Sequence, residues 1–314
     1  MIDRTVNDRP TSETAIVLRG IAKAFSGHVA VRDLSLEVPR GSVFGLLGPN
    51  GAGKTTTLRM VMDILAPDSG TIEILGRPAD RASRDRIGYM PEERGLYPRM
   101  TLDEQLLFMA AIKGMARRDA EARLGPWLER FGLAGWRRRK VNELSKGMQQ
   151  KAQFVATVLH EPDVLIMDEP MSGLDPVGMD DMREAMLELR RRGATIVLSS
   201  HQMEAVERLC DRVALLNRGE KVLDGSVAEV KARHGKNTVA LAFEGDGSFI
   251  ESLPGVSGVS DHGQYVEVRM RDGADPQRLL HEAAARLRIR RFEIVEPSLH
   301  RIFVETVTGK EEAA

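Results

Sequence analysis

The chain has 314 residues, of which 42% are hydrophobic and 29% charged, a composition typical of soluble globular proteins with room for more than one domain. Its formal net charge of −1 gives no overall basic field of the kind that attracts nucleic acid. No segment approaches the roughly 20 apolar residues of a membrane span. The single cysteine, Cys210, excludes a disulfide framework within the chain, fits a reducing cytosol and is expected to be a small buried apolar residue.

The chain begins with a polar stretch, residues 1–14, which has no apolar centre and is therefore not a secretory signal. We expect this stretch to be a flexible leader. Strand-like runs follow at residues 16–18 and 29–38, and the apolar run at residues 43–47 predicts a buried strand. A helical pattern then covers residues 57–65.

Residues 48–56, between that strand and that helix, read GPNGAGKTT and fit the phosphate-loop pattern G-x-x-x-x-G-K-[ST]. Glycines let the backbone curl so that its N–H groups face an anion, and the helix N-terminus adds partial positive charge. Lys54 can reach the outer phosphates, and the Thr55 hydroxyl can ligate Mg²⁺. The alternative, a glycine-rich turn with a chance lysine, is disfavoured by the flanking strand and helix. The nucleotide-binding residues expected in this loop are Gly48, Pro49, Asn50, Gly51, Ala52, Gly53, Lys54, Thr55 and Thr56.

Helical patterns occupy the middle of the chain. Thr101 and Glu104 form a capping box that predicts the start of a helix, and a second helical pattern covers residues 120–131. We expect these helices to belong to an inserted helical subdomain at about residues 92–160. The basic run at residues 137–140 is most simply a solvated helix or loop face, with attraction to anionic lipid headgroups as the minor alternative.

Two acidic residues follow a second apolar run, residues 164–167. Asp168 can hold Mg²⁺ against the phosphates, and Glu169 can polarise an attacking water as a general base. Two solvated acids at the start of a loop would be the simpler interpretation of this pair alone. A phosphate loop in the same chain favours the metal and base roles.

The order of the motifs resembles that of one family. The phosphate loop is followed by LSKG at residues 144–147, by Asp-Glu-Pro at 168–170, by SGLDP at 172–176 and by SSH at 199–201. This order resembles ABC transporter ATPase subunits over about residues 15–235. The resemblance implies an α/β fold, with a P-loop ATPase core of mixed sheet and an inserted helical subdomain, and it implies ATP and Mg²⁺ as ligands.

The resemblance also assigns roles to residues. It implies that Ser145 begins a helix whose N-terminus binds the γ-phosphate held by the other subunit of a dimer, with Gly147 giving close backbone approach; Ser is also a good N-cap. Asp175 matches the family's dimer-contact aspartate, and His201 matches its switch histidine at the γ-phosphate. The catalytic residues implied are Glu169, His201 and Lys54. The departures from the family's signature are Lys146 and Met148.

Two more positions match the family pattern. Phe25 falls where the family has an aromatic ring that stacks on adenine, with a core phenylalanine as the alternative. Glu92 falls where the family usually has a glutamine that contacts Mg²⁺. A carboxylate can also ligate Mg²⁺, although it adds negative charge beside the phosphates, and the side chain could instead face a membrane partner. The metal ligands implied are Thr55, Asp168 and Glu92.

The composition changes near residues 233–236, and the remaining chain predicts a small α+β domain over residues 236–314 without a catalytic signature. Asp275, followed by proline, predicts a helix start, and Ser298 predicts the cap of a final helix. The strands expected there lie at residues 238–243, 264–269 and 291–295. Segments 91–97 and 296–303 resemble a bacterial exporter-type subgroup that carries such a C-terminal accessory domain.

These features predict an ATP-hydrolysing subunit of an ABC transporter that powers transport, in the direction of export, through a separate membrane subunit. We expect as partners a second copy of the chain, or a homologous ATPase subunit, and a multi-span permease, with no nucleic acid. The expected location is cytoplasmic and peripheral, at the inner face of the cell membrane.

Two other classes of protein compete with this prediction. A soluble ABC ATPase acting on nucleic acid or ribosomes would call for tandem cassettes or a long coiled-coil insert, and for basic surfaces. This chain has one cassette, no heptads and balanced charge. A regulatory nucleotide-binding module without turnover is disfavoured because Glu169 and His201 are both present.

Overall fold

The structure is a computed structural model that describes residues 13–80, 85–93, 95–233, 238–271, 273–295 and 297–308. All but the last two residues of the predicted leader lie outside the described residues. Contacts divide the chain into two compact units, Met1–Asp224 and Gly225–Ala314.

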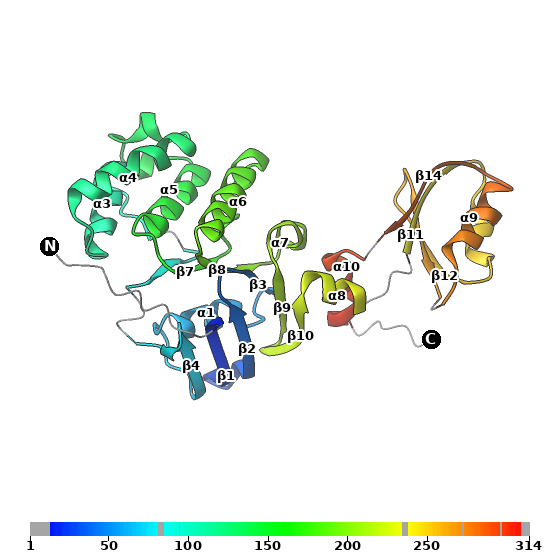
Figure 1. The fold of residues 1–314 in the computed structure, drawn as a ribbon, viewed down its shortest axis with the longest axis horizontal. Helices are drawn as coiled ribbons and strands as arrows, with labels where there is room; N and C mark the ends of the chain where they lie inside the picture. The colour runs from blue at the N-terminus through cyan, green and yellow to red at the C-terminus, as the bar shows by residue number, and fades with distance from the viewer. Residues whose placement is uncertain are drawn as a thin grey trace. The chain divides into compact units, whose positions relative to one another are not determined.

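The first unit carries two sheets and a group of helices (Figure 1). Its strands are β1 (Thr14–Phe25), β2 (His28–Pro39), β3 (Val43–Leu47), β4 (Ser69–Ile74), β5 (Arg77–Pro78), β6 (Ile87–Met90), β7 (Val164–Asp168), β8 (Thr195–Ser200), β9 (Arg212–Asn217) and β10 (Glu220–Ser226). Its helices are α1 (Lys54–Val61), α3 (Leu102–Ile112), α4 (Arg117–Arg130), η1 (Ala134–Trp136), η2 (Val141–Glu143), α5 (Lys146–Val158), α6 (Pro176–Arg191) and α7 (Met203–Leu209).

A six-stranded sheet of order β10-β9-β3-β8-β7-β6 forms the centre of this unit. Strand β3 pairs in parallel with β8 and β9, and β7 pairs in parallel with β6 and β8. Strands β3, β7 and β8 are buried along their whole length, as continuous apolar runs predict. Because parallel strands end at one edge of a sheet, the loops that follow β3, β7 and β8 lie close together.

A second sheet, of order β2-β1-β4-β5, is antiparallel. One hydrophobic core joins its inner side chains, such as Ile16 and Leu34, to Leu46 of β3, Ile166 of β7 and Leu58 of α1. Helix α1 is therefore packed against both sheets. Burial of aliphatic side chains at roughly 1.5–3 kcal/mol each fixes the helix that continues from the phosphate loop.

Helices α3, α4 and α5 lie together, apart from the antiparallel sheet (Figure 1). The predicted capping box is present: Glu104 N donates to Thr101 Oγ1 at 3.3 Å, and Thr101 N donates to Glu104 Oε2 at 2.8 Å. Phe154 of α5, fully buried, packs edge-on against Trp127 and Phe131 at ring distances of 6.0 and 5.6 Å. This aromatic contact attaches α5 to α4.

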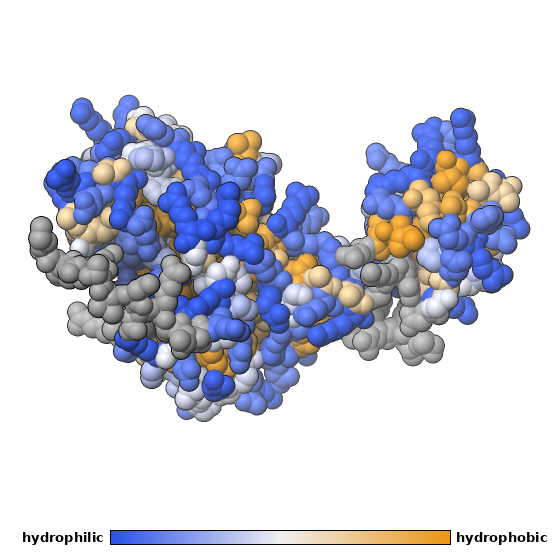
Figure 2. Space-filling view, in the orientation of Figure 1, coloured by the Kyte–Doolittle hydropathy of each residue, from blue (hydrophilic) through white to orange (hydrophobic). Residues whose placement is uncertain are grey.

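The second unit contains an antiparallel sheet of order β12-β13-β11-β14. Its core includes Val239, Leu241, Val268 and Leu279. As predicted, Asp275 caps α9, accepting from Gln277 N at 2.9 Å. Hydrophobic surface also shows on this unit (Figure 2). Its elements are α8 (Val227–Arg233), β11 (Thr238–Glu244), η3 (Ser248–Ser252), β12 (Val256–Asp261), β13 (Val266–Met270), α9 (Pro276–Ala284), β14 (Arg288–Val295) and α10 (Leu299–Thr308).

The dividing point differs from the one expected from composition. The predicted boundary follows residue 235, whereas the compact units divide between Asp224 and Gly225. Helix α8 contacts α10, and this contact assigns α8 to the second unit. The domain limits given by the sequence stay a prediction, since compactness alone does not define a domain that folds by itself.

Candidate nucleotide site

The phosphate loop joins the buried end of β3 to the start of α1. All three of its glycines have positive φ, including 148° at Gly48 and 102° at Gly53. A Cβ atom at Gly48 would lie 2.3 Å from the Leu216 carbonyl oxygen, and one at Gly53 would lie 2.4 Å from that of Ala30. Both contacts are too close for any side chain, so the loop requires glycine at these positions.

Lys54 is the first residue of α1, directly after the last glycine of the loop, and is only 6% exposed. Its ammonium donates to the carbonyl oxygens of Gly48 at 2.8 Å and Pro49 at 3.2 Å. Burial lowers the pKa of Lys54, while the carboxylates of Glu169, Asp168 and Glu92 act in the opposite direction. A buried cation of this kind is stabilised further by an anionic ligand.

Asp168 ends β7 and is 1% exposed. One carboxylate oxygen, Oδ1, accepts from Ser199 Oγ. The other, Oδ2, is buried and has no hydrogen-bond partner within the described residues. A buried carboxylate oxygen without a donor destabilises the fold unless a cation contacts it. This oxygen therefore fits the Mg²⁺ that the resemblance implies.

Thr55 offers a second oxygen ligand for Mg²⁺. Thr55 lines the same cleft as Asp168. Across the described part of the chain, no group of three or more His, Cys, Asp or Glu side chains is arranged to hold a metal alone. Proteins usually bind Mg²⁺ through one or two carboxylates together with phosphates and water, and Asp168 offers one such carboxylate.

Glu169, directly after β7, has a left-handed backbone with φ of 50°. Its N–H donates to Ser199 Oγ at 3.0 Å. Its side chain is almost buried, and Oε1 lies 2.9 Å from Nδ1 of His201 and 3.9 Å from Nζ of Lys54. Because an ionised carboxylate only accepts hydrogen bonds, Nδ1 of His201 carries the proton and donates it.

These side chains line a cleft of about 450 Å³. The predicted site residues that line it are Phe25, Asn50, Gly51, Ala52, Gly53, Lys54, Thr55, Thr56, Glu92, Asp168, Glu169 and His201. Phe25 is 44% exposed and thus offers ring surface to a ligand, in place of the core position that was the alternative. Glu92 belongs to the same lining, and its role toward the metal stays a prediction.

Five predicted residues do not line this cleft. Gly48 and Pro49 hold the Lys54 ammonium instead, as described above. Ser145 caps α5, accepting from Met148 N at 3.2 Å, and Asp175 caps α6, accepting from Gly178 N at 2.7 Å. Both capping residues are exposed. Gly147, in the first turn of α5, lies next to Ser145. The cleft therefore contains no residue of the LSKG segment.

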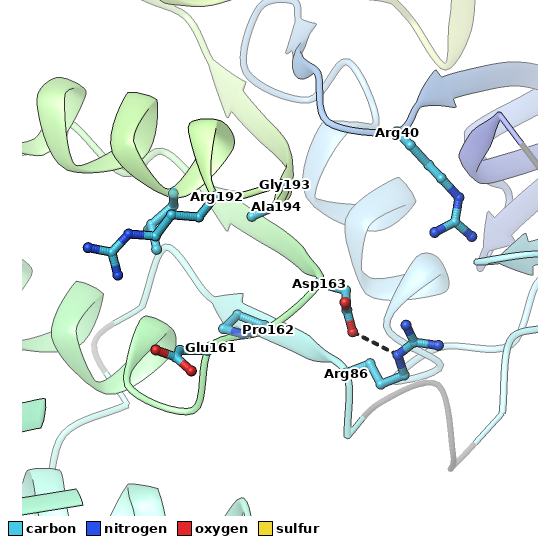
Figure 3. Close-up of a pocket in the computed structure, with 9 residues that line it drawn as sticks. Arg40, Arg86, Glu161, Pro162, Asp163, Arg192, Gly193 and Ala194 are labelled. Atoms are coloured by element: carbon cyan, nitrogen blue, oxygen red, sulfur yellow. Dashed lines mark hydrogen bonds and ion pairs between the residues drawn. The ribbon is translucent and has the colours of Figure 1, made fainter. Parts of the chain in front are cut away.

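A second cavity of about 560 Å³ lies at the opposite ends of the strands, where Arg86 precedes β6 and Asp163 precedes β7 (Figure 3). Arg86 Nε donates to Asp163 at 2.7 Å, and Glu161 pairs with Arg123 at 2.8 Å. Burial and the positive charge of Arg86 lower the pKa of Arg40. Both acids of this cavity are thus already paired, and ligands of open parallel sheets bind at the carboxyl ends instead.

Sequence reasoning missed some residues in the cleft and beside it. Ser199 connects Asp168 to the backbone of Glu169, and a polar residue inside a fully buried strand was a usable signal for it. His28 and Ser172 also line the cleft, and no local pattern distinguishes either residue.

The site combines a glycine-rich loop after a parallel strand, a buried lysine, and an acidic pair at the end of a second parallel strand of the same sheet. These features define a P-loop nucleoside triphosphatase. The family pattern described as "ABC transporter" matches residues 31–172, and that described as "ATP-binding protein DrrA1-3-like, C-terminal domain" matches residues 225–307.

Two relatives and a solved structure indicate the same family. The chain is 43% identical to the uncharacterized ABC transporter ATP-binding protein YhaQ of Bacillus subtilis (strain 168) over 287 residues, covering 91% of this chain and 96% of that protein. It is 40% identical to the Nod factor export ATP-binding protein I of Burkholderia orbicola (strain AU 1054), covering 68% and 72%. A structure of the ATP-binding subunit of an ABC transporter matches with a TM-score of 0.67 and 33% identity, covering 71% and 94%.

The chain therefore belongs to the ATP-binding proteins of ABC transporters. Its predicted fold class, family and ATPase activity are confirmed, and it binds ATP as these subunits do. Within the described residues, no helix has both the length and the apolar character needed to cross a membrane.

Proposed function

We propose that the chain hydrolyses Mg²⁺-bound ATP at sites shared between two ATPase subunits and thereby powers export through a separate membrane permease. The observation that carries this proposal is the position of Glu169 Oε1, which lies 2.9 Å from His201 Nδ1 and 3.9 Å from Lys54 Nζ in the wall of the phosphate-loop cleft. A base, a cation and a histidine thus meet where a γ-phosphate would end.

We assign a separate role in ATP binding or hydrolysis to each of these residues of the cleft. Phe25 offers a ring face for the adenine, while the loop N–H groups and Lys54 bind the phosphates. Glu169 accepts a proton from the water that attacks the γ-phosphorus. Lys54 stabilises the charge that develops on the transferred phosphoryl group, and His201 fixes the orientation of the Glu169 carboxylate.

Three residues would hold Mg²⁺ in this cleft: Thr55 through its hydroxyl, Asp168 through its unpartnered Oδ2, and Glu92 through its carboxylate. When bound, Mg²⁺ neutralises phosphate charge and orients the β- and γ-phosphates. The hydrogen bond from Ser199 Oγ to Oδ1 fixes the orientation of the Asp168 carboxylate.

The position of the LSKG segment supports a dimer. Ser145 begins α5 outside its own subunit's cleft and is exposed. A helix N-terminus with free N–H groups and a nearby serine hydroxyl binds anions well. We assign Ser145 and Gly147 to the γ-phosphate of a second subunit, and Asp175, exposed at the start of α6, to the contact between subunits.

The proposed direction of transport and the proposed location in the cell are inferred from relatives and from the family. The Burkholderia relative is described as a Nod factor export protein, and the resemblance of residues 91–97 to exporter-type subunits points the same way. No described helix could form a pore, so transport requires another chain with membrane spans. We therefore place this subunit at the inner face of the cell membrane, attached to that permease.

We also propose that the nucleotide-binding domain ends near residue 235 and that the following α+β domain serves assembly or coupling. The residues assigned to ATP lie between Phe25 and His201, far upstream of this boundary.

The experiment that tests this function measures phosphate release from ATP by the purified chain, with Mg²⁺ and with a chelator, alone and with the multi-span protein encoded beside it. We expect release only with Mg²⁺, and stimulation when the permease is present in vesicles. A folded chain that binds ATP but releases no phosphate under either condition would contradict the proposal.

A further inference from the structure

Helix α5 carries two glutamines, Gln150 and Gln153, whose side chains are almost fully buried, at 2% and 4% exposure. They are separated by three positions and therefore lie on one face of the helix. The neighbouring buried positions of the helix are largely apolar, among them Ala152, Phe154 and Val155. Amide groups at such positions require hydrogen bonds, because burying an unpaired amide destabilises the fold.

Gln153 holds the backbone on both sides of Glu92. Its Nε2 donates to the carbonyl oxygen of Pro91 at 2.8 Å and to that of Glu93 at 3.4 Å. Its Oε1 is buried and has no hydrogen-bond partner within the described residues. The only bonds that this side chain makes in the described structure thus go to the segment that presents Glu92 to the nucleotide cleft.

Gln150 holds the backbone at the proposed catalytic base. Its Nε2 donates to the carbonyl oxygen of Pro170 at 3.0 Å and lies 3.4 Å from that of Glu169. The backbone of Glu169 is left-handed, with φ of 50°, a conformation that is strained for a non-glycine residue. Such a conformation persists only when its neighbours fix it, and Gln150 and Ser199 supply the contacts.

We infer that Gln153 and Gln150 are positioning residues for the ATPase reaction: from one helix, Gln153 sets Glu92 toward Mg²⁺, and Gln150 sets Glu169 toward water. The inference rests on the proposed function of Glu92 and Glu169. The N-cap of the same helix is Ser145, which we assign to the other subunit's nucleotide. Helix α5 therefore connects the state of one composite site to both carboxylates of the other.

The two glutamines should affect different quantities. Loss of the Gln153 bonds leaves Glu92 free to turn away from the metal, which reduces the gain in nucleotide affinity that Mg²⁺ provides. Loss of the Gln150 bonds misplaces the base, which lowers kcat and leaves that gain unchanged. A purely structural role would lower both quantities together, in proportion to the loss of stability.

The first test replaces Gln153 by methionine, which keeps the volume and removes the donor, in a Glu169→Gln background that does not hydrolyse ATP. A fluorescent ATP analogue is titrated with Mg²⁺ and with a chelator, and the ratio of the two Kd values is the readout. We expect Q153M to reduce this ratio about five- to tenfold, the effect of losing one hydrogen bond that fixes a ligand. Gln153→Asn, which is too short to reach Pro91, should do the same.

The matched control is Gln149→Met on the same helix. Gln149 Nε2 donates to the carbonyl oxygens of Leu144 at 2.9 Å and Val141 at 3.2 Å, so it holds neither carboxylate. The Gln149→Met protein should have the same Kd ratio as the Glu169→Gln parent. Gln150→Met, made in the active chain, should lower kcat about tenfold with KM for ATP unchanged.

Equal Kd ratios in the Q153M, Q153N and Q149M proteins, all verified as folded by thermal melting, would overturn the role of Gln153. A kcat of Q150M equal to that of the wild type would overturn the role of Gln150. Failure of the proposed function has a separate signature, because the Glu169→Gln parent would then show no gain in affinity from Mg²⁺ and the wild-type chain would show no hydrolysis.

Discussion

Glu169 and His201 are joined by a 2.9 Å hydrogen bond between Oε1 and Nδ1. Glu169 follows β7 and His201 follows β8, so the parallel pairing of these strands sets this distance. Nζ of Lys54, after β3, lies 3.9 Å from the same oxygen. Three neighbouring strand ends therefore converge on one carboxylate, which fixes its direction before any nucleotide binds.

Replacing Glu169 by glutamine should remove the base and keep the shape of the cleft. We expect kcat for ATP hydrolysis to fall at least about 100-fold, the lower range for a general base, while ATP affinity stays within about twofold. Phosphate release and equilibrium binding of a fluorescent ATP analogue measure the two quantities. Lys54→Ala is the comparison, because it should weaken binding as well. Near-normal turnover by the Glu169→Gln protein would refute the assigned role.

The phosphate loop and the acidic pair were predictable because each is a local pattern beside an apolar strand. Ser145, Asp275 and the Thr101 capping box were predictable for the same reason, since a helix cap depends on neighbours within a few residues. Cys210 is buried as expected, although α7 ends one residue before it.

Other features depended on contacts distant in sequence. Strand β12 was not predicted, because its serines and glycine give a weak strand pattern and only pairing with β13 defines it. Helix α8 was missed as well, and its contact with α10 moves the division between units away from the predicted boundary. The buried strand marks Ser199 as unusual, but its bond to Asp168 joins β8 to β7, so no local pattern could show that partner.

Glu92→Gln should change how the site depends on Mg²⁺, because Glu92 lines the cleft and adds a full negative charge to it. We expect the Mg²⁺ concentration for half-maximal ATPase activity to rise about three- to tenfold. Metal-free nucleotide binding should stay similar or become tighter, since one negative charge near the phosphates is gone. A Mg²⁺ titration with and without the permease measures both effects.

Glu93→Gln is the matched control, since Glu93 is exposed and does not line the cleft. Its Mg²⁺ midpoint should match that of the wild type. If Glu92→Gln leaves the midpoint unchanged and lowers only the permease-stimulated activity, Glu92 acts toward the membrane partner and its metal role is refuted.

The shared-site geometry predicts complementation between two inactive variants. A Ser145→Arg subunit lacks the helix end that closes the partner's site, and a Lys54→Ala subunit lacks its own phosphate cradle. A mixed dimer retains one intact composite site, whereas each homodimer has none. ATPase activity should therefore reappear when dimers verified as mixed are isolated with two different tags. No recovery in such dimers would count against the assignment of Ser145 to the partner's nucleotide.

Truncation tests the domain limits. A chain that ends after residue 236 should bind the fluorescent ATP analogue with an affinity within about twofold of that of the full chain, because the residues assigned to ATP lie upstream and make a core of their own. Dimer formation or stimulation by the permease should decrease. The measurements are equilibrium binding and size-exclusion chromatography. Loss of ATP binding by a truncated chain that still melts cooperatively would show that the C-terminal residues contribute to the site.

His160 should make the fold sensitive to acid. It lies just after α5, half-buried, with Nε2 3.3 Å from the Ile87 carbonyl oxygen, which also accepts from Lys113 Nζ at 2.9 Å. Burial, aided by the positive charge of Lys113, lowers the pKa of His160 to about 4, although Ile87 and Asp85 oppose the shift. In the folded state the ring therefore stays neutral at pH values where an unfolded chain protonates it.

The direction of the change in stability with pH follows from the lower pKa of His160 in the folded state than in the unfolded chain. The contribution of His160 to stability is complete above pH 6.5, decreases as the pH falls, and is fully lost below about pH 4, where both states are protonated. The loss amounts to at most about 3 kcal/mol, and partial exposure of the ring reduces it. His160→Gln, which cannot titrate, should show a smaller difference in unfolding free energy between pH 7.5 and pH 5 than the wild type. Urea unfolding without nucleotide measures it, with the exposed His28→Gln as control; equal pH dependence in the wild-type and His160→Gln proteins would refute the prediction.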